Sequence, residues 1–206
     1  MDTSNVSSPT GAARPLRSRA RDAMKAETVA AASRLFDAQG FDNTTVDQIA
    51  AAAGLSRATF FRYFKTKEDV ALDDLQGMGQ RVAAAFTARP EDERPWTALR
   101  RAFDVITEDK ASEPDRSLRF FTMMCQTPSL KARHWEKQQR WHELLDPEMR
   151  RRLGRPAAVN DPVATALVGA GLACLDAATE AWLAGKGTET LATLLDQSMG
   201  ALDNRA

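Results

Sequence analysis

The chain has 206 residues, of which 43% are hydrophobic and 27% are charged, a composition typical of folded globular proteins and not of disordered chains. Its two cysteines, Cys125 and Cys174, are too few for a disulfide framework, which favours a reducing compartment. No stretch approaches the roughly 20 consecutive apolar residues of a membrane span, and residues 1–21 lack the apolar core of a secretory signal, so we expect a cytoplasmic protein without a membrane partner.

The formal net charge of zero conceals an uneven distribution. Residues 14–67 contain ten Lys and Arg and five Asp and Glu, a net charge of +5, and the rest of the chain therefore carries −5. A basic N-terminal third on an acidic body indicates a polyanionic partner at that end. A non-specific architectural DNA-binding protein would be positive throughout, so that class is not favoured. We expect residues 1–20 to form a flexible basic N-terminal arm.

Amphipathic helices account for most of the chain. The first, over about 22–38, has an apolar stripe at helical spacing and ends before Gly40. No run of β-branched residues alternates as a strand would, so we expect an all-α fold of about nine helices. Beyond two short helices in 46–64, helices are predicted over 67–87, from Pro95, from Pro114, from Pro128, over 162–184 and over 188–202. Residues 150–160 are expected to form a basic loop or a fraying helix end.

Two short helices in residues 46–64 have signals that mark where they begin and end. Thr45 followed by Gln48 three residues later is a capping-box pattern, which predicts the start of a helix at residue 46. Gly54 closes this helix, and Ser56 is the expected N-cap of the next helix, over 57–64. Two short helices joined by a turn of a few residues are the requirement of a helix-turn-helix.

Three residues lie at the positions that helix-turn-helix geometry requires. Ala50 is small enough for the second short helix to approach the first, Gly54 supplies a turn with positive φ, and Phe60 packs back as the apolar residue of the second helix. The second helix would then present a polar face to the major groove of DNA, where Arg57 pairs with guanine and Thr59 contacts a base. The predicted DNA-contacting residues are Lys25, Thr44, Thr45, Ser56, Arg57, Ala58, Thr59, Phe61, Arg62, Tyr63 and Lys67.

This pattern resembles the TetR family of bacterial regulators over roughly residues 20–70. The residues that carry the resemblance, in order and spacing, are Leu35-Phe36, Gly40-Phe41, Thr44-Thr45-Val46, Ile49-Ala50, Ala53-Gly54-Leu55-Ser56, Thr59-Phe60, Tyr63-Phe64 and Lys67-Glu68. The resemblance implies a three-helix DNA-binding domain over 21–68, a ligand-binding and dimerisation domain over 69–206, and a nucleoid-associated regulator in a bacterial cytoplasm.

The same resemblance implies roles for individual side chains. Thr45, Tyr63 and Lys67 fall at phosphate-contacting positions, and Arg57, Thr59 and Arg62 fall at base-facing ones. Phe61 departs from the pattern, because the family usually has a phosphate-binding tyrosine there. Ala58 replaces a frequent glycine, which is a milder departure.

The C-terminal helices are predicted to form a homodimer. The 162–184 helix is apolar nearly all round and carries small residues that permit close helix approach. Together with the last helix it would build a four-helix interface across a two-fold axis. The alternative is that both helices complete the core of one chain. The residues predicted for the interface are Leu167, Leu175, Leu191 and Leu195.

A ligand pocket is predicted between the middle helices. Aromatic residues and methionines line adaptable apolar pockets, although each of these residues taken singly is more often plain core than pocket lining. Three segments resemble an actinobacterial subgroup of the family that includes the mycofactocin-cluster regulator: Phe60–Phe64, Pro128–Arg133 and Ala181–Leu183. This resemblance implies an effector with a long acyl chain or an acyl-CoA-like structure. The predicted lining residues are Phe103, Phe120, Phe121, Met124, Trp135 and Trp141.

Other classes of function have weaker support. Cys125 with His134 or His142 could form a thiol–imidazole pair, but nothing in the sequence sets a third orienting group, so a hydrolase is disfavoured. A metal or redox sensor on the same fold is a further alternative, since His134, His142 and Glu143 lie close in sequence. We expect no cofactor and no metal. The sequence therefore predicts a transcriptional regulator. We expect a repressor that a small hydrophobic or acyl-chain effector releases from a palindromic double-stranded DNA operator. The alternative is a transcriptional activator.

Overall fold

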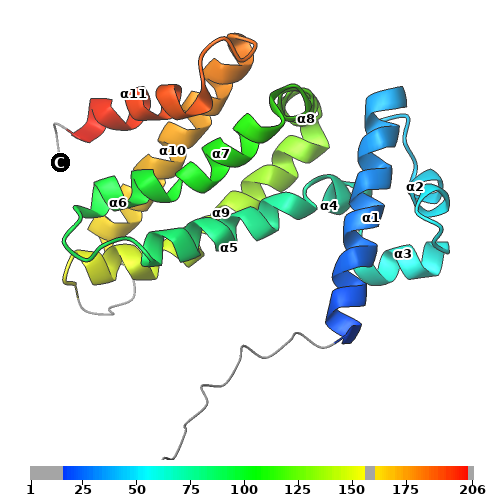
Figure 1. The fold of residues 1–206 in the computed structure, drawn as a ribbon, viewed down its shortest axis with the longest axis horizontal. Coiled ribbons are helices and arrows are strands. Elements are labelled where there is room, and N and C mark those ends of the chain that lie inside the picture. Colours follow the sequence, from blue (N-terminus) through cyan, green and yellow to red (C-terminus); the bar gives the residue numbers. More distant parts are fainter. Residues whose placement is uncertain (1–15, 156–160, 204–206) are drawn as a thin grey trace, which may run out of the picture. The chain divides into compact units, whose positions relative to one another are not determined.

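The computed structural model describes residues 16–155 and 161–203 (Figure 1). Within these ranges the chain forms eleven α-helices and no strand, so the predicted all-α fold is confirmed with two helices more than expected. The chain divides into two compact units, Met1–Val70 and Ala71–Ala206.

The N-terminal unit contains α1 (Leu16–Gln39), α2 (Val46–Ala52), α3 (Arg57–Tyr63) and the start of α4 (Lys67–Ala71). Residues 16–20, expected in the flexible arm, belong instead to α1. The reason is that Leu, Arg and Ala are good helix formers and no Gly or Pro interrupts them. The rest of the predicted arm, residues 1–15, lies outside the described residues.

The core of the N-terminal unit confirms the expected helix-turn-helix packing. Ile49 and Ala50 of α2 and Phe60 of α3 are buried, and Phe60 has no exposed surface. Phe36 and Phe41 pack on each other with ring centroids 5.1 Å apart, and Phe60 and Phe64 do so at 5.7 Å. Ala50 and Phe60, which the spacing identifies as the packing residues of the two short helices, are therefore buried in this core.

Two of the predicted helices are each divided in two by a buried residue, Leu72 or Phe103. The 67–87 helix breaks at Leu72 into α4 and α5 (Asp73–Thr87), and the helix from Pro95 breaks at Phe103 into α6 (Pro95–Ala102) and α7 (Asp104–Ser112). Leu72 and Phe103 are both fully buried. At Phe103 the backbone N–H donates to the carbonyls of both Leu99 and Arg100, the tighter pattern of a 3₁₀ turn. Each break lets a large side chain enter the core.

The remaining helices are α8 (Pro114–Gln126), α9 (Pro128–Arg152), α10 (Pro162–Ala184) and α11 (Leu191–Asp203). In the C-terminal unit α5 packs along α9, and α10 packs against both α9 and α11 (Figure 1). The last helix begins three residues later than the predicted residue 188, because Thr190 caps it by accepting a hydrogen bond from the Thr193 backbone N–H.

Helix α10 is the most apolar element. By length and composition alone it is long and apolar enough to cross a membrane, with a mean hydropathy of 1.4, a property that core helices of folded domains share. Val168, Leu172 and Trp182 of this helix are buried. A Cβ atom on Gly171 would lie 2.6 Å from Cδ2 of Leu99, so the absence of a side chain lets α10 approach α6 closely.

Candidate functional site

A capping box fixes the start of α2, as predicted. The Gln48 backbone N–H donates to Oγ1 of Thr45 at 3.2 Å, and the Thr45 backbone N–H donates to Oε1 of Gln48 at 2.9 Å. Gln39 at the end of α1 adds a hydrogen bond from its Nε2 to the same Oε1 at 3.1 Å. No local sequence signal predicts this hydrogen bond, which ties α1 to the N-terminus of α2.

The turn between α2 and α3 has the expected left-handed glycine. Gly54 has φ of +66°, and the Leu55 backbone N–H donates to the Ala50 carbonyl at 2.8 Å, which satisfies a free carbonyl at the end of α2. Ser56 then caps α3 by accepting a hydrogen bond from the Thr59 backbone N–H at 3.1 Å. The chain from Thr45 to Tyr63 therefore forms a helix-turn-helix.

The outer face of α3 is open to solvent. Arg57, Ala58, Phe61 and Arg62 are exposed, whereas Phe60 on the opposite side is fully buried. The Arg62 guanidinium lies over the ring of Tyr63, 5.3 Å from its centroid. This face has the length, charge and accessibility that a helix needs to enter a major groove.

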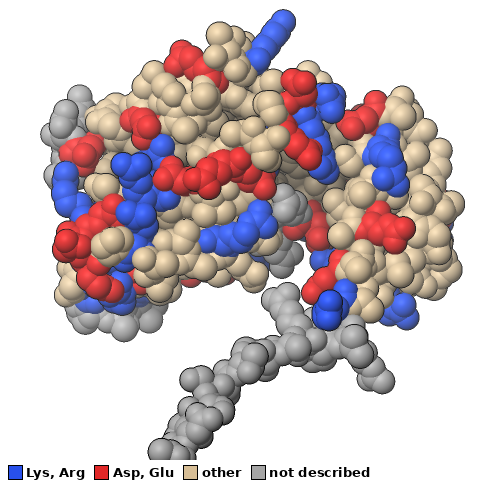
Figure 2. Space-filling model, in the orientation of Figure 1, with Lys and Arg blue, Asp and Glu red and all other residues tan. Residues whose placement is uncertain are grey.

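Asp47 and Arg57 form an ion pair across the two helices. Nη1 of Arg57 donates to Oδ1 of Asp47 at 2.9 Å and to Oδ2 at 2.8 Å. Figure 2 shows basic and acidic side chains interspersed over the drawn face. The two residues are ten apart in sequence and lie on different helices, so no helical spacing could have identified the pair.

Two of the predicted DNA-contacting residues, Thr44 and Lys67, have side chains that form hydrogen bonds within the fold. Thr44 is only 1% exposed, and its Oγ1 donates to the Gly40 carbonyl at 2.8 Å. Nζ of Lys67 donates to the carbonyls of Phe41 at 2.8 Å and Thr44 at 3.1 Å, and it lies 4.3 Å from the centroid of the Phe41 ring. Both side chains hold the loop between α1 and α2.

The other predicted DNA-contacting residues lie on or near the exposed side of this unit. Lys25 of α1 is half-buried and lies over the Phe64 ring, 5.3 Å from its centroid. Thr45 and Ser56 are exposed although their hydroxyls cap helices, and Thr59 and Tyr63 are half-buried.

Three of the four residues predicted for the dimer interface lie in the core of one chain. Leu175 and Leu191 are buried and Leu195 has no exposed surface, so their side chains have almost no area left for a second copy. Leu167 alone is partly exposed. The alternative, that α10 and α11 complete the core of the chain, therefore holds for these three leucines, because α11 packs its apolar stripe onto α10.

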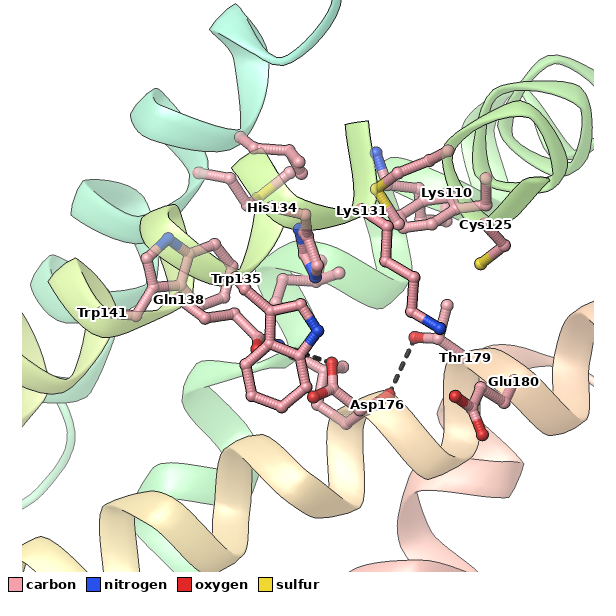
Figure 3. A pocket seen from close by; sticks show the side chains of 16 residues that line it. Lys110, Cys125, Lys131, His134, Trp135, Gln138, Trp141, Asp176, Thr179 and Glu180 are labelled. Carbon is pink, nitrogen blue, oxygen red and sulfur yellow. Dashed lines mark hydrogen bonds between the residues drawn. The ribbon is translucent and has the colours of Figure 1, made fainter. Parts of the chain in front are cut away.

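A cavity of about 180 Å³ lies among helices α5, α7, α8, α9 and α10 of the C-terminal unit (Figure 3). Phe121, Met124, Trp135 and Trp141 line it, as predicted. The prediction was wrong for Phe103, which is fully buried in the core, and for Phe120, which does not line the cavity. Trp135 is 57% exposed, so its indole stands at the open side.

Polar side chains that were not predicted also line the cavity. Oδ1 of Asp176 accepts a hydrogen bond from Nε2 of Gln138 at 2.6 Å (Figure 3). Burial raises the pKa of the Asp176 carboxyl above its usual range, and the hydrogen bond from Gln138 partly opposes this shift. Nζ of Lys110 pairs with Asp109 at 2.7 Å and lies 5.5 Å from the centroid of the Phe121 ring. The sequence signal that could have identified Asp176 as a cavity residue is its position as an acidic residue within α10, the most apolar helix.

The surroundings of Cys125 do not favour a reactive thiol. Cys125 lines the cavity, and burial raises the pKa of its thiol, which disfavours the thiolate that a nucleophile requires. In the part of the chain that the structure describes, no group of three or more His, Cys, Asp or Glu side chains could hold a metal ion.

Comparisons with known proteins agree with this geometry. The sequence profile described as "Bacterial regulatory proteins, tetR family" matches residues 29–73, and the profile "MftR C-terminal domain" matches residues 93–206. The mycofactocin biosynthesis transcriptional regulator MftR of Mycobacterium tuberculosis is 30% identical over 182 residues, which cover 84% of this chain and 87% of MftR.

Two further proteins are similar over different lengths. The transcriptional regulator TcmR of Streptomyces glaucescens is 36% identical over 110 residues, which span 52% of this chain and about half, 49%, of TcmR. The crystal structure of FadR from Thermus thermophilus, a repressor in complex with lauroyl-CoA, matches with a TM-score of 0.59 and 26% identity over 86% of this chain and 92% of FadR. With the helix-turn-helix and the helical C-terminal unit, these matches show that the chain belongs to the TetR family of DNA-binding transcriptional regulators.

Proposed function

We propose that this regulator is a homodimeric repressor that binds a near-palindromic operator at the bacterial nucleoid and releases it when a small hydrophobic effector enters the cavity. The observation that carries the DNA-binding half of the proposal is the solvent-open outer face of α3, held on a capped helix-turn-helix. In a dimer, two such helices would enter successive major grooves, about 34–36 Å apart.

The side chains of the helix-turn-helix are proposed to contact either base edges or phosphates. Arg57 at the first position of α3 would contact a base edge, with Thr59 and Arg62 beside it. Thr45 and Tyr63 would contact phosphates, together with the backbone N–H groups at the N-terminus of α2. Thr44 is left out because it is buried, and Lys67 is left out because its ammonium bonds the carbonyls of the loop before α2. Arg19 and Arg21, exposed in the first turns of α1, would add minor-groove or phosphate contacts.

The effector is proposed to be a molecule with an acyl chain, such as an acyl-CoA. The apolar lining from Phe121, Met124 and Trp141 suits a hydrocarbon chain, and the similar FadR structure is described in complex with lauroyl-CoA. An effector that binds better to the state with low operator affinity releases the operator, and its effect is limited by its differential affinity for the two states.

The dimer is proposed to form through exposed parts of α10 and α11. Val163 and Leu202 are each 39% exposed, and Leu167 is partly exposed. Leu202→Glu combined with Leu167→Glu should convert the dimer to a monomer in light scattering. Leu144→Glu, at an equally exposed leucine of α9, is the matched control and should leave the dimer intact.

The DNA-binding proposal is tested by selecting bound fragments from genomic DNA with the purified protein. We expect recovery of a sequence with two-fold symmetry, with half-sites one helical turn apart or a multiple of that spacing. Arg57→Ala should lower the preference for one base pair in each half-site. Arg101→Ala, which removes an exposed arginine of α6, should not change that preference. Failure to retain any duplex at low salt would refute the proposal.

The effector proposal is tested separately, with the operator in hand. Lauroyl-CoA should quench or shift the fluorescence of the tryptophans at the cavity and release the operator, and coenzyme A alone should do neither. Trp135→Ala should weaken lauroyl-CoA binding without unfolding the protein, because this side chain is largely exposed. Release by coenzyme A alone, or no release at saturating lauroyl-CoA, would contradict an acyl-chain effector.

A further inference from the structure

Arg57 is held on two sides. Its Nη1 donates to both carboxylate oxygens of Asp47, at 2.9 and 2.8 Å, and its guanidinium lies over the ring of Phe61, 5.6 Å from the centroid. The Phe61 ring in turn packs edge-on against Phe60, with centroids 5.5 Å apart, and Phe60 is fully buried. The position of an exposed arginine is therefore tied through one ring to the core of the domain.

This arrangement contributes little to folding. The Arg57 and Asp47 side chains are 65% and 62% exposed, and exposed ion pairs are screened by water and add little to stability. An acidic side chain beside a DNA-reading helix also repels phosphates. The arrangement therefore needs an explanation other than stability or general attraction to DNA.

The hydrogen bonds to Asp47 leave one edge of the guanidinium for a ligand. Nη1 is occupied, while Nε–H and Nη2–H remain as two parallel donors. Among the described residues neither donor has an acceptor. Two parallel N–H donors match O6 and N7 of guanine, which lie side by side on the major-groove edge.

We propose that Asp47 is a positioning residue for DNA recognition, which, with Phe61, holds Arg57 ready to read a guanine in the major groove. This inference rests on the proposed operator binding. Asp47 orders the long arginine side chain before DNA arrives, so less conformational freedom is lost on binding. Its charge also lowers affinity for duplexes that offer no guanine to Arg57, so it favours specificity over total affinity.

The alternative is that Asp47 only stabilises the first turn of α2, where a carboxylate interacts favourably with the helix dipole. That role predicts a loss of thermal stability in every Asp47 variant but no change in base preference. The positioning role predicts a change in the base preference at one position and a gain in affinity for unrelated DNA. The two roles therefore differ in a readout that stability does not affect.

The test measures the affinity of the full-length protein for the selected operator with each of the four bases at every position. Retention of that operator by the wild-type protein tests the proposed function itself and is established first. Asp47→Ala should reduce the preference for guanine at one base pair by roughly five-fold or more, within the range of a bidentate arginine contact. It should also raise affinity for an unrelated duplex. Asp42→Ala, which removes another exposed acid of the same unit, should leave the base preference unchanged.

Asp47→Asn covers the case in which the alanine variant unfolds α2. It keeps one acceptor oxygen for Nη1 and should give a base preference between those of the wild type and of Asp47→Ala. In the Arg57→Ala background, Asp47→Ala should produce no further change in base preference, because Asp47 acts through Arg57. Unchanged preference in both Asp47 variants, or an equal effect of Asp47→Ala with and without Arg57, would overturn the proposal.

Discussion

A Cβ atom on Gly79 of α5 would lie 2.7 Å from Cδ1 of Trp141 on α9. The Trp141 indole therefore packs directly on the backbone of α5, at a point where any side chain would displace it. Trp141 also lines the cavity. The position of this part of the cavity wall therefore depends on Gly79 having no side chain. Gly77, one half-turn away on the same helix, has no such constraint, since a Cβ there would meet only Nη1 of Arg81 at 3.7 Å.

Gly79→Ala should therefore destabilise the protein and alter the cavity. Overpacking of a filled interior costs about 1–3 kcal/mol, which exceeds the roughly 1 kcal/mol that alanine gains over glycine in a helix. Gly77→Ala is the matched control and should raise stability. Urea unfolding and tryptophan emission measure both effects. Equal stabilisation by the two substitutions would show that Trp141 can move without cost.

Gly54→Ala should weaken the helix-turn-helix by backbone strain alone. Gly54 has φ of +66°, and a Cβ there would meet no atom within 4 Å, so no clash contributes. A left-handed conformation costs an L-residue about 1–2 kcal/mol. Gly54→Asn should lose less, because asparagine tolerates this conformation better. Thermal unfolding measures the difference, and equal losses for alanine and asparagine would contradict an origin in φ.

Lys67→Ala should destabilise the N-terminal unit without changing how strongly DNA binding depends on salt. The Lys67 ammonium satisfies the carbonyls of Phe41 and Thr44, and removing it leaves these acceptors with fewer donors at a cost of about 1–3 kcal/mol. Lys65→Ala, at a neighbouring exposed lysine, is the control for loss of one positive charge. A slope of affinity against salt that falls by about one unit for Lys67→Ala alone would restore its role as a phosphate contact.

Local structure in the N-terminal unit was predictable from the sequence, whereas contacts between distant elements, such as those of Lys67, were not. Local signals were sufficient for the caps at Thr45 and Ser56 and for the turn at Gly54, because each depends on residues within four positions. The direction of a side chain that crosses between elements was not predictable. Lys67 reaches back over 26 residues to Phe41, and no spacing rule covers that distance.

The same limit applies to the C-terminal unit. Apolar periodicity identified the helices but could not distinguish a buried stripe from an interface stripe, so Leu191 and Leu195 were assigned to a dimer although they complete one core. The cavity residues Phe121 and Trp141 were identified as large apolar groups, whereas Phe103 has the same character and lies in the core. Distinguishing them requires knowing how five helices meet.

Asp176→Asn should stabilise the protein at neutral pH. Burial raises the pKa of this carboxyl above its ordinary value of 3.8, so the folded state pays for its ionisation at every pH above that value. Asparagine avoids the charge and keeps an oxygen that can accept the hydrogen bond from Gln138. The gain should disappear as the pH falls below 3.8, where the wild-type carboxyl is protonated in both states. Glu180→Gln, one turn further along α10 and exposed, should show no comparable gain in urea unfolding at pH 7.

Glu148 should make the C-terminal unit sensitive to acid. Hydrogen bonds from Arg151 and then Arg152 lower the pKa of this buried carboxyl below its ordinary value of 4.5. A lowered pKa in the folded state adds stability above pH 4.5 that is lost as the pH falls through the folded-state value. Glu148→Gln should therefore be less stable than the wild type at pH 7, and the gap should close in acid. Glu143→Gln, at an exposed position of the same helix, should cause no comparable loss of stability at pH 7.

Arg152 connects Glu148 to the end of α5 and to the loop between α5 and α6. Its guanidinium is 1% exposed and donates to Glu148 at 2.7 Å and to the carbonyls of Phe86 at 3.0 Å and Arg89 at 2.7 Å. Arg152→Ala leaves a buried carboxylate with one partner fewer and should cost about 3 kcal/mol at pH 7. Arg151→Ala removes an arginine that is half exposed and should cost less, because water replaces it. Urea unfolding of both variants at pH 7 decides the point: equal costs would mean that the carbonyls of the loop gain nothing from Arg152.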